Sequence, residues 1–302
     1  AMMTGLMPTG KFHIGHAILA QQFTFYQKLG CKLYIAVADI ESYNARGQTL
    51  EDSRKNAIEE YITNYIALGL KPKNVEIYFQ SDRSKDAKKA NAYYRLQNLL
   101  ARHITFNEFR ASYGDVTPGK IISGLLQASD MLHPMLPEFS GMIPTFIPVG
   151  SDQDPHIRLT RDIVKRLKQP KFMQLSSTYH LFFPALNGDK MSASDPNSFI
   201  AMTDDAATVK KKIMKYAFSG GQETIEKHRK LGGNPEVDIS FQWLTFFEED
   251  DKKLTKIYND YKSGKMLSGE LKQIIVDKLN KFLLEHQKKM KLAKKEIPKF
   301  LR

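Results

Sequence analysis

The sequence is poor in cysteine and in tryptophan, and it has no long run of apolar residues. Its 302 residues include one cysteine, Cys31, so neither an intrachain disulfide nor a cysteine-based zinc site can form. No apolar run approaches the roughly 18–20 residues of a membrane helix, which argues against a membrane span. No signal-peptide pattern opens the chain, which predicts a location in the reducing cytoplasm.

Acidic residues are also scarce relative to basic ones. Asp and Glu number 33 against 45 Lys and Arg, which gives a formal charge of +12. The 42% of apolar residues is ordinary for a globular protein and argues against wholesale disorder. The basic charge is compatible with an anionic partner such as nucleic acid, and equally with a lysine-rich solvated surface. Charge alone does not choose between them.

The first 80 residues alternate between strand and helix signals. Gly30 ends the first helical pattern as a C-terminal cap, and the apolar run that follows is typical of a strand buried on both faces. Strand–helix–strand units of this kind predict an α/β fold with a doubly wound parallel, Rossmann-like sheet. The predicted elements are strand 2–6, helix 17–29, strand 33–38, helix 51–70 and strand 75–79.

The rest of the chain predicts an insertion and a second domain. Helices are expected at 86–104 and 119–132, within an insertion at about 82–145, before the sheet resumes with strand 146–149. From residue 204 apolar residues recur at helical spacing, which predicts an all-helical C-terminal domain. The predicted domains are a catalytic domain 1–203, a helical domain 204–293 and a C-terminal basic helix 294–302.

The stretch Pro8–His16 lies at the turn from the first strand into the first helix, where doubly wound sheets bind nucleotides. His13 and His16 are three residues apart, share one helix face and can donate hydrogen bonds to phosphate oxygens. Gly15 has no side chain, so a flat base or ribose can lie against its backbone. Two histidines that merely cap a helix are the alternative. The candidate nucleotide-binding residues here are Thr9, Gly10, His13, Gly15 and His16.

A second stretch, Gly188–Pro196, reads as a loop that carries one lysine, Lys190. A lysine on a mobile loop can follow charge as it moves during phosphoryl or nucleotidyl transfer. Ser192 and Ser194 can donate further hydrogen bonds, and Met191 lies between them and the lysine. Taken alone, this stretch is a weak functional signal.

Together the two stretches resemble the paired signatures of class I aminoacyl-tRNA synthetases, HIGH and KMSKS in one-letter code. The match is complete at His13–His16 and four of five at Lys190–Ser194, where Ala193 replaces the second lysine. The resemblance implies that His13, His16 and Lys190 are catalytic. It also implies ATP as a substrate, with Mg²⁺ held mainly by ATP oxygens and no dedicated metal ligands in the protein.

Three further regions resemble tryptophanyl-tRNA synthetases of archaeal and eukaryotic type. They are residues 150–162, 190–198, and 217–221 taken together with 244–251. This resemblance implies activation of L-tryptophan to its adenylate, transfer to tRNA(Trp), a homodimer and a cytoplasmic location. It also implies that the helical domain reads the anticodon, although no motif shows which residues do so.

The resemblance assigns the amino-acid site as well. It implies that Glu41 and Gln153 hold the ammonium and carboxylate of the amino acid, and that Gly150 and Asp152 hold the ATP ribose. Asp130 resembles the aspartate that accepts the indole N–H in bacterial enzymes, and a buried acceptor there would reject phenylalanine. The alternatives are a solvated helix cap for Glu41 and a helix-end carboxylate for Asp130.

Two departures from the family pattern keep other functions open. Eukaryotic enzymes read indole with a tyrosine and a glutamine, but Met3 and Ala36 stand at the matching positions. Since a phenol could also donate to Asp130, a tyrosyl-tRNA synthetase is one alternative. A synthetase-like paralogue that binds RNA or partners without charging tRNA is another. The abrupt start of the first strand leads us to expect a segment before it.

Overall fold

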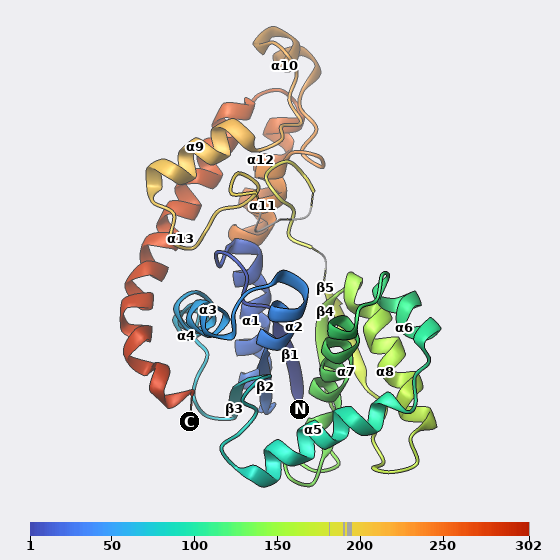
Figure 1. Ribbon diagram of the computed structural model, residues 1–302. Coiled ribbons are helices and arrows are strands. Elements are labelled where there is room, and N and C mark those ends of the chain that lie inside the picture. The colour runs from blue at the N-terminus through green and yellow to red at the C-terminus, as the bar shows by residue number, and fades with distance from the viewer. Residues whose placement is uncertain (181, 190, 192–194, 302) are drawn as a thin grey trace. The chain divides into compact units, whose positions relative to one another are not determined.

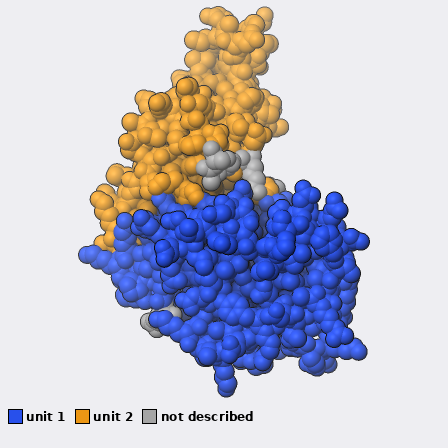
Figure 2. All heavy atoms as spheres, viewed as in Figure 1, with its two compact units in different colours: residues 1–9, 21–181, 294–302 blue, residues 10–20, 182–293 orange. Residues whose placement is uncertain are grey.

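The computed structural model describes residues 1–180, 182–189, 191 and 195–301. The chain divides into two compact units, shown in different colours in Figure 2. Unit 1 comprises Ala1–Thr9, Gln21–Leu181 and Lys294–Arg302, and unit 2 comprises Gly10–Ala20 and Phe182–Ala293. These units are defined by contacts in space, whereas the boundary at 203/204 is drawn from the sequence, and that boundary stays a prediction.

Unit 1 contains a five-stranded parallel sheet in the order β3-β2-β1-β4-β5. Strand order reverses between β1 and β4, which is where doubly wound sheets bind ligands. The predicted α/β class is therefore confirmed. The strands are β1 (Met2–Leu6), β2 (Leu33–Val37), β3 (Val75–Phe79), β4 (Phe146–Gly150) and β5 (Ser176–His180).

The inner strand β2 and the edge strand β5 differ in both burial and sequence. All five residues of β2 are buried, as expected of a parallel strand with helices on both faces. The edge strand β5 has the sequence SSTYH and is partly exposed along its length. It has one neighbouring strand, β4, and its polar sequence left it unpredicted.

Helices cover both faces of this sheet. Figure 1 shows α7 and α8 on one side of unit 1 and α3 and α4 on the other, with α5 along the bottom. The helix predicted at 51–70 is observed as α3, a π-helical turn and α4 in succession, while α2 and α6 were not predicted. The helices of unit 1 are α2 (Asp39–Arg46), α3 (Leu50–Asn56), η1 (Ala57–Ile62), α4 (Thr63–Ala67), α5 (Ala87–Ala101), α6 (Phe106–Tyr113), α7 (Pro118–Leu132), η2 (His133–Met135), η3 (Ser151–Gln153) and α8 (Asp154–Arg166).

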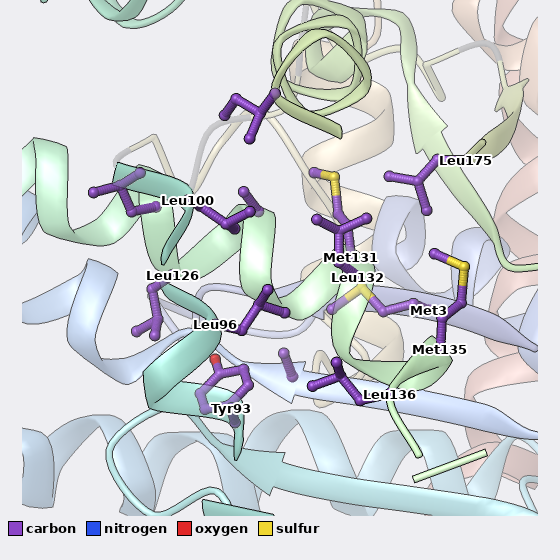
Figure 3. Packing of buried hydrophobic residues seen from close by; sticks show 14 of the residues in the cluster. Met3, Tyr93, Leu96, Leu100, Leu126, Met131, Leu132, Met135, Leu136 and Leu175 are labelled. Atoms are coloured by element: carbon purple, nitrogen blue, oxygen red, sulfur yellow. The ribbon is translucent and has the colours of Figure 1, made fainter. Parts of the chain in front are cut away.

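The core of unit 1 packs α5, α7 and α8 against the sheet. Met3 from β1 lies among Met131 and Leu132 of α7 and Met135 of η2, and α5 contributes Leu96 (Figure 3). Each fully buried apolar side chain of this size stabilises the fold by about 1.5–3 kcal/mol relative to leaving it exposed. This packing fixes α7, the helix that carries Asp130.

Unit 2 is mostly helical, as predicted for the C-terminal part of the chain. Trp243 lies in the core of this unit, because it is fully buried and donates its indole N–H to the carbonyl oxygen of Pro184 at 3.0 Å. Helix α1 (Ile14–Lys28) begins in unit 2 and continues into unit 1. The other helices are α9 (Ala206–Tyr216), α10 (Ile225–Leu231), α11 (Ile239–Phe247), α12 (Asp251–Lys262) and α13 (Ser268–Glu296).

The C-terminal segment 294–302, predicted as a separate basic helix, begins as the last residues of α13. A 3₁₀ turn, η4 (Ile297–Lys299), follows. The lysines of the run 288–295 are exposed, as a solvated helix face requires. Within the described part of the chain, no helix is both long and apolar enough to cross a membrane.

Candidate nucleotide and amino-acid sites

Backbone pairing in unit 2 ties the histidine signature to the residues that follow the lysine loop. The Ile14 N–H donates to the Ile200 carbonyl oxygen at 3.0 Å, and the Met202 N–H donates to the Phe12 carbonyl oxygen at 3.0 Å. His13 and Ala201 form an antiparallel bridge between these two bonds. Two segments far apart in the sequence therefore form one local structure.

The two histidine rings stack on each other, with their centroids 3.7 Å apart. The backbone N–H of His13 donates to His16 Nδ1 at 3.3 Å, so the proton of a neutral His16 lies on Nε2. His13 Nδ1 is buried and has no hydrogen-bond partner among the described residues. The predicted donation to phosphate remains chemically possible, and it requires only a neutral imidazole.

Both histidines are neutral at pH 7. Burial and, to a smaller extent, the neighbouring His16 lower the pKa of His13 to about 2. Burial also lowers the pKa of His16, to about 4. Each ring therefore offers one N–H donor rather than a positive charge.

The histidine signature has glycine at two positions, Gly10 and Gly15, where a side chain would be unfavourable. Gly10 has a φ of 70°, which a residue without a Cβ adopts at little cost. A Cβ on Gly15 would lie 3.1 Å from Met191 Sδ and 3.2 Å from His13 Cε1, so a side chain has little room there. Met191 therefore lies against the histidine signature. The predicted residues Lys190, Ser192 and Ser194 lie outside the described residues.

In unit 1, further candidates follow β1 and β4, the strands on either side of the point where strand order reverses. Thr9 follows β1, and its carbonyl oxygen accepts a hydrogen bond from the Tyr61 hydroxyl at 2.8 Å. Gly150 ends β4, and Asp152 lies in the turn η3 directly after it. These positions lie at the carboxyl ends of neighbouring strands, where a nucleotide is bound in this fold class.

Glu41 lies in the first turn of α2 and is partly buried. Burial and the nearby Asp130 carboxylate raise the pKa of Glu41 to about 7, and Arg46 opposes this shift. The environment does not fit the alternative of a solvated helix cap. A cationic group placed beside Glu41 would restore its ionisation.

Gln153 is oriented by a short chain of hydrogen bonds that leads back to α6. Gln127 Nε2 donates to Gln153 Oε1 at 3.3 Å, and the Tyr113 hydroxyl donates to Gln127 Oε1 at 2.8 Å. The Tyr113 ring stacks on Phe109 with a centroid distance of 4.3 Å. The Gln153 amide is therefore bonded to α7 and, through Gln127, linked to α6.

Asp130 is a buried carboxylate, with 2% of its surface exposed. Oδ1 accepts hydrogen bonds from the hydroxyls of Tyr78 and Tyr93, each at 2.6 Å, and Oδ2 accepts one from Gln80 Nε2 at 2.8 Å. Burial raises the pKa of Asp130 to about 6, while the three hydrogen bonds and Arg83 oppose the shift. The alternative of an ordinary helix-end carboxylate does not describe this environment.

Sequence analysis missed these three donors. A buried carboxylate must find hydrogen-bond partners, so their existence could have been expected from Asp130 itself. Their identities could not, because Tyr78 and Tyr93 read as core aromatics in a strand and a helix. Gln80 follows a strand and belongs to no motif.

A buried arginine lies beside this carboxylate. Arg83 Nη1 pairs with Glu76 at 2.7 Å, and Arg83 Nη2 lies 2.8 Å from His133 Nε2. The guanidinium also lies over the Tyr78 ring, 3.9 Å from its centroid. His133 Nδ1 lies 2.9 Å from the Asp130 carbonyl oxygen, so one neutral tautomer can donate there and accept from Arg83. Sequence analysis missed this cluster as well.

The described residues hold no group of three or more His, Cys, Asp or Glu side chains that could bind a metal ion.

Comparison with known proteins places this geometry in a family. Residues 1–284 match the family model described as tRNA synthetases class I (W and Y). The tryptophan–tRNA ligase of Aeropyrum pernix is 43% identical over 296 residues, which cover 97% of this chain and 78% of that protein. The enzyme of the same name from Methanocaldococcus jannaschii is 41% identical over 307 residues, covering 100% and 81%.

Solved structures agree with the sequence relatives. The crystal structure of tryptophanyl-tRNA synthetase from Aeropyrum pernix K1 superposes with a TM-score of 0.94 at 41% identity, covering 100% of this chain and 81% of that one. The tryptophanyl-tRNA synthetase from Encephalitozoon cuniculi bound to tryptophan has a TM-score of 0.85 at 28% identity, covering 100% and 81%. The chain belongs to the class I tRNA synthetases of the tryptophan and tyrosine group.

Proposed function

We propose that the chain activates L-tryptophan with ATP to tryptophanyl-adenylate and transfers the amino acid to tRNA(Trp). The observation that carries this proposal is the pairing of Phe12–Ile14 with Ile200–Met202, which joins the histidine signature to the segment that follows the second signature in the sequence. The names of the sequence relatives favour tryptophan over tyrosine as the substrate.

In the first step the tryptophan carboxylate attacks the α-phosphorus of ATP, a new O–P bond forms, and pyrophosphate leaves. No covalent enzyme intermediate is needed, so positioning and stabilisation of charge supply the rate. His13 and His16 donate hydrogen bonds to the phosphates as neutral imidazoles. Lys190 follows the charge that develops on pyrophosphate, and Ser192 and Ser194 donate to it.

ATP also needs contacts away from the reacting phosphorus. Thr9, Gly10 and Gly15 supply backbone against the nucleotide, and Met191 belongs to the same set. Gly150 gives close backbone approach, and the carboxylate of Asp152 accepts hydrogen bonds from ribose hydroxyls. Mg²⁺ accompanies ATP and is held mainly by phosphate oxygens, because this ion retains waters and prefers phosphate ligands.

The amino acid is held by three side chains of unit 1. Its ammonium lies against Glu41, whose raised pKa returns toward the ordinary value beside a cation. Gln153 contacts the carboxylate end, and Asp130 accepts the indole N–H. Since Asp130 is 2% exposed, neighbouring side chains must yield to admit the ring. Met131 and Met135 are flexible thioethers and suit that role.

In the second step the 2′-hydroxyl of the terminal ribose of tRNA(Trp) attacks the carbonyl carbon of the adenylate, and AMP leaves. The helical part of unit 2 contacts the tRNA, and the enzyme acts as a cytoplasmic homodimer. The positive charge of the chain favours association with the anionic RNA.

ATP–pyrophosphate exchange, measured in parallel with tryptophan and with tyrosine, tests this function. We expect exchange with tryptophan and at least 100-fold less with tyrosine, since a mismatched polar group in a buried site costs discrimination of about that size or more. Exchange with tyrosine alone would reassign the substrate. Exchange with neither amino acid would mean a paralogue that does not activate amino acids.

A further inference from the structure

The hydrogen bonds around Asp130 determine how many further hydrogen bonds its carboxylate can accept. An ionised carboxylate has about four positions that accept hydrogen bonds. Among the described residues, Tyr78, Tyr93 and Gln80 occupy three of them, at distances of 2.6, 2.6 and 2.8 Å. One position, on Oδ2, is left for a ligand.

We infer that Tyr78, Tyr93 and Gln80 are positioning residues of the amino-acid site, and that together they present Asp130 as an ionised acceptor with a single open position. This inference rests on the proposed function, because it takes Asp130 as the group that reads the indole. It adds three residues that contact the carboxylate from β3, the turn after it and α5.

The ligand group selected by such an arrangement is one that only donates. An indole N–H donates one hydrogen bond and has no lone pair that needs a partner. A phenol hydroxyl also donates, but its buried oxygen would need a donor in return. The three donors that contact Asp130 are already bonded to it, so none of them can serve that oxygen without giving up its bond to the carboxylate.

The charged neighbours of Asp130 act in both directions. Arg83 favours the ionised carboxylate, whereas Glu41 on α2 lies close enough for the two carboxylates to disfavour each other's charge. Tyr78 and Tyr93 remain protonated donors, because burial and Asp130 raise the pKa of each well above its usual range. His133 is neutral, because burial lowers its pKa. The donors and Arg83 therefore oppose burial, which favours the protonated acid.

Gln80 adds a link between the two carboxylates of the site. Its Nε2 donates to Asp130, while its Oε1 lies 3.4 Å from the backbone nitrogen of Glu41, a long contact. The Tyr94 hydroxyl donates to the Gln80 carbonyl oxygen at 2.8 Å and fixes the backbone there. The amide therefore has a defined orientation, with its N–H group directed at Asp130.

The test is the pH dependence of tryptophan binding to the full chain, measured by calorimetry from pH 5 to 8.5 for wild type, Tyr78→Phe and Tyr93→Phe. Loss of one hydrogen bond to a carboxylate raises its pKa. We therefore expect the acidic limb, the pH range in which tryptophan affinity falls on acidification, to move up by about one pH unit. At pH 6.5 each variant should bind tryptophan several-fold more weakly than wild type. At pH 8.5 the difference should be about twofold or less.

Tyr34→Phe is the matched control. Tyr34 is also a fully buried tyrosine whose ring packs against His133, but its hydroxyl bonds to Ser140 Oγ at 2.6 Å rather than to Asp130. Its acidic limb should coincide with that of wild type. Since Glu41 titrates in the same range, the difference between variants carries the test, rather than the position of any one limb.

A carbon-13 titration of the Asp130 carboxyl group in the wild-type chain needs no substitution. We expect a midpoint near pH 6 in the free protein and a lower midpoint with tryptophan bound, because an indole hydrogen bond favours the ionised form. An unchanged midpoint would overturn the inference, as would limbs in Tyr78→Phe and Tyr93→Phe that match Tyr34→Phe. Failure of wild type to bind tryptophan would instead refute the proposed function.

Discussion

Two buried polar groups, one in each unit, differ in how they are paired. In unit 1, Asp130 receives three hydrogen bonds from its own chain before any ligand arrives. In unit 2, His13 Nδ1 is buried without a hydrogen-bond partner among the described residues. The Asp130 carboxylate is largely hydrogen-bonded before a ligand binds, so it selects a ligand by shape and by the one position that can still accept a hydrogen bond. A site with an unpaired atom gains a missing partner when the ligand binds.

Burial shifts the pKa values of the two sites in opposite directions. Burial raises the pKa of Glu41 and Asp130 in unit 1 and lowers the pKa of His13 and His16 in unit 2. All four groups move toward neutrality, as desolvation requires. Changes at Glu41 and Asp130 should alter binding of the amino acid, and changes at His13 and His16 should alter the ATP step.

The largest effect is expected from Lys190→Ala. Loss of a group that stabilises charge in the transition state lowers the rate by about 10²–10³-fold. Adenylate formation, followed by single-turnover kinetics, should fall by this factor while the Kd for tryptophan changes little. Lys210→Ala, on the exposed surface of α9, serves as the control and should leave both unchanged. An equal loss of rate and tryptophan affinity would remove the distinction between the two units.

A smaller and opposite pattern is expected from Asp130→Asn. The amide presents an N–H group where the carboxylate accepted a hydrogen bond, so the KM for tryptophan should rise by about 10–100-fold. The KM for ATP should stay within about twofold, as measured by pyrophosphate exchange. Asp115→Asn changes an exposed carboxylate of the same unit and should match wild type. Unchanged selectivity would mean that another residue reads the indole.

Gly15→Ala should act on ATP by about one order of magnitude. The added Cβ would lie 3.1 Å from Met191 Sδ, which is flexible, and 3.2 Å from the stacked His13 ring, which is not. Overpacking of about 1–2 kcal/mol raises the KM for ATP about tenfold. Tryptophan binding measured without ATP should be unaltered, and a loss there would contradict the assignment of Gly15 to the nucleotide.

A further difference concerns the pH dependence of stability, to which the two sites should contribute with opposite signs. The folded pKa of His13 is lowered, so its contribution to stability is present above about pH 6.5 and is lost as the pH falls. The folded pKa of Asp130 is raised, so its contribution is present below about pH 4 and is lost as the pH rises through 6.

Urea unfolding at pH 5 and pH 7 separates these contributions. His13→Gln should reduce the loss of stability on acidification by about 2 kcal/mol. Asp130→Asn should increase that loss, because it removes the carboxyl whose protonation favours the folded state. Changes of the same sign in both variants would contradict the comparison.

Much of the fold follows from local sequence signals. Buried strands such as Leu33–Val37 are apolar throughout, because helices cover both faces of a parallel sheet. The edge strand Ser176–His180 could not be found in this way, since its polar residues carry no such signal. Helix α2, Asp39–Arg46, was missed because it is short and its apolar content is low.

The sequence reveals the neighbours within the nucleotide signature more readily than the neighbours of Asp130. His13 and His16 are neighbours in the sequence, and their spacing alone places them on one helix face. The partners of Asp130 come from β3 and α5, so only the folded chain brings them to one carboxylate. Contacts between distant segments of this kind leave no local pattern, and Tyr78 and Tyr93 are ordinary core residues when each is considered alone.

The pairing of Phe12–Ile14 with Ile200–Met202 has a consequence for the order in which the protein is made. The ribosome synthesises the histidine signature first, and the backbone partners of that signature follow more than 180 residues later. Contacts between such distant segments form slowly, because a long loop must close first. A nascent chain that stops before residue 200 therefore lacks these partners, and translation must pass that point before the signature can take its final form.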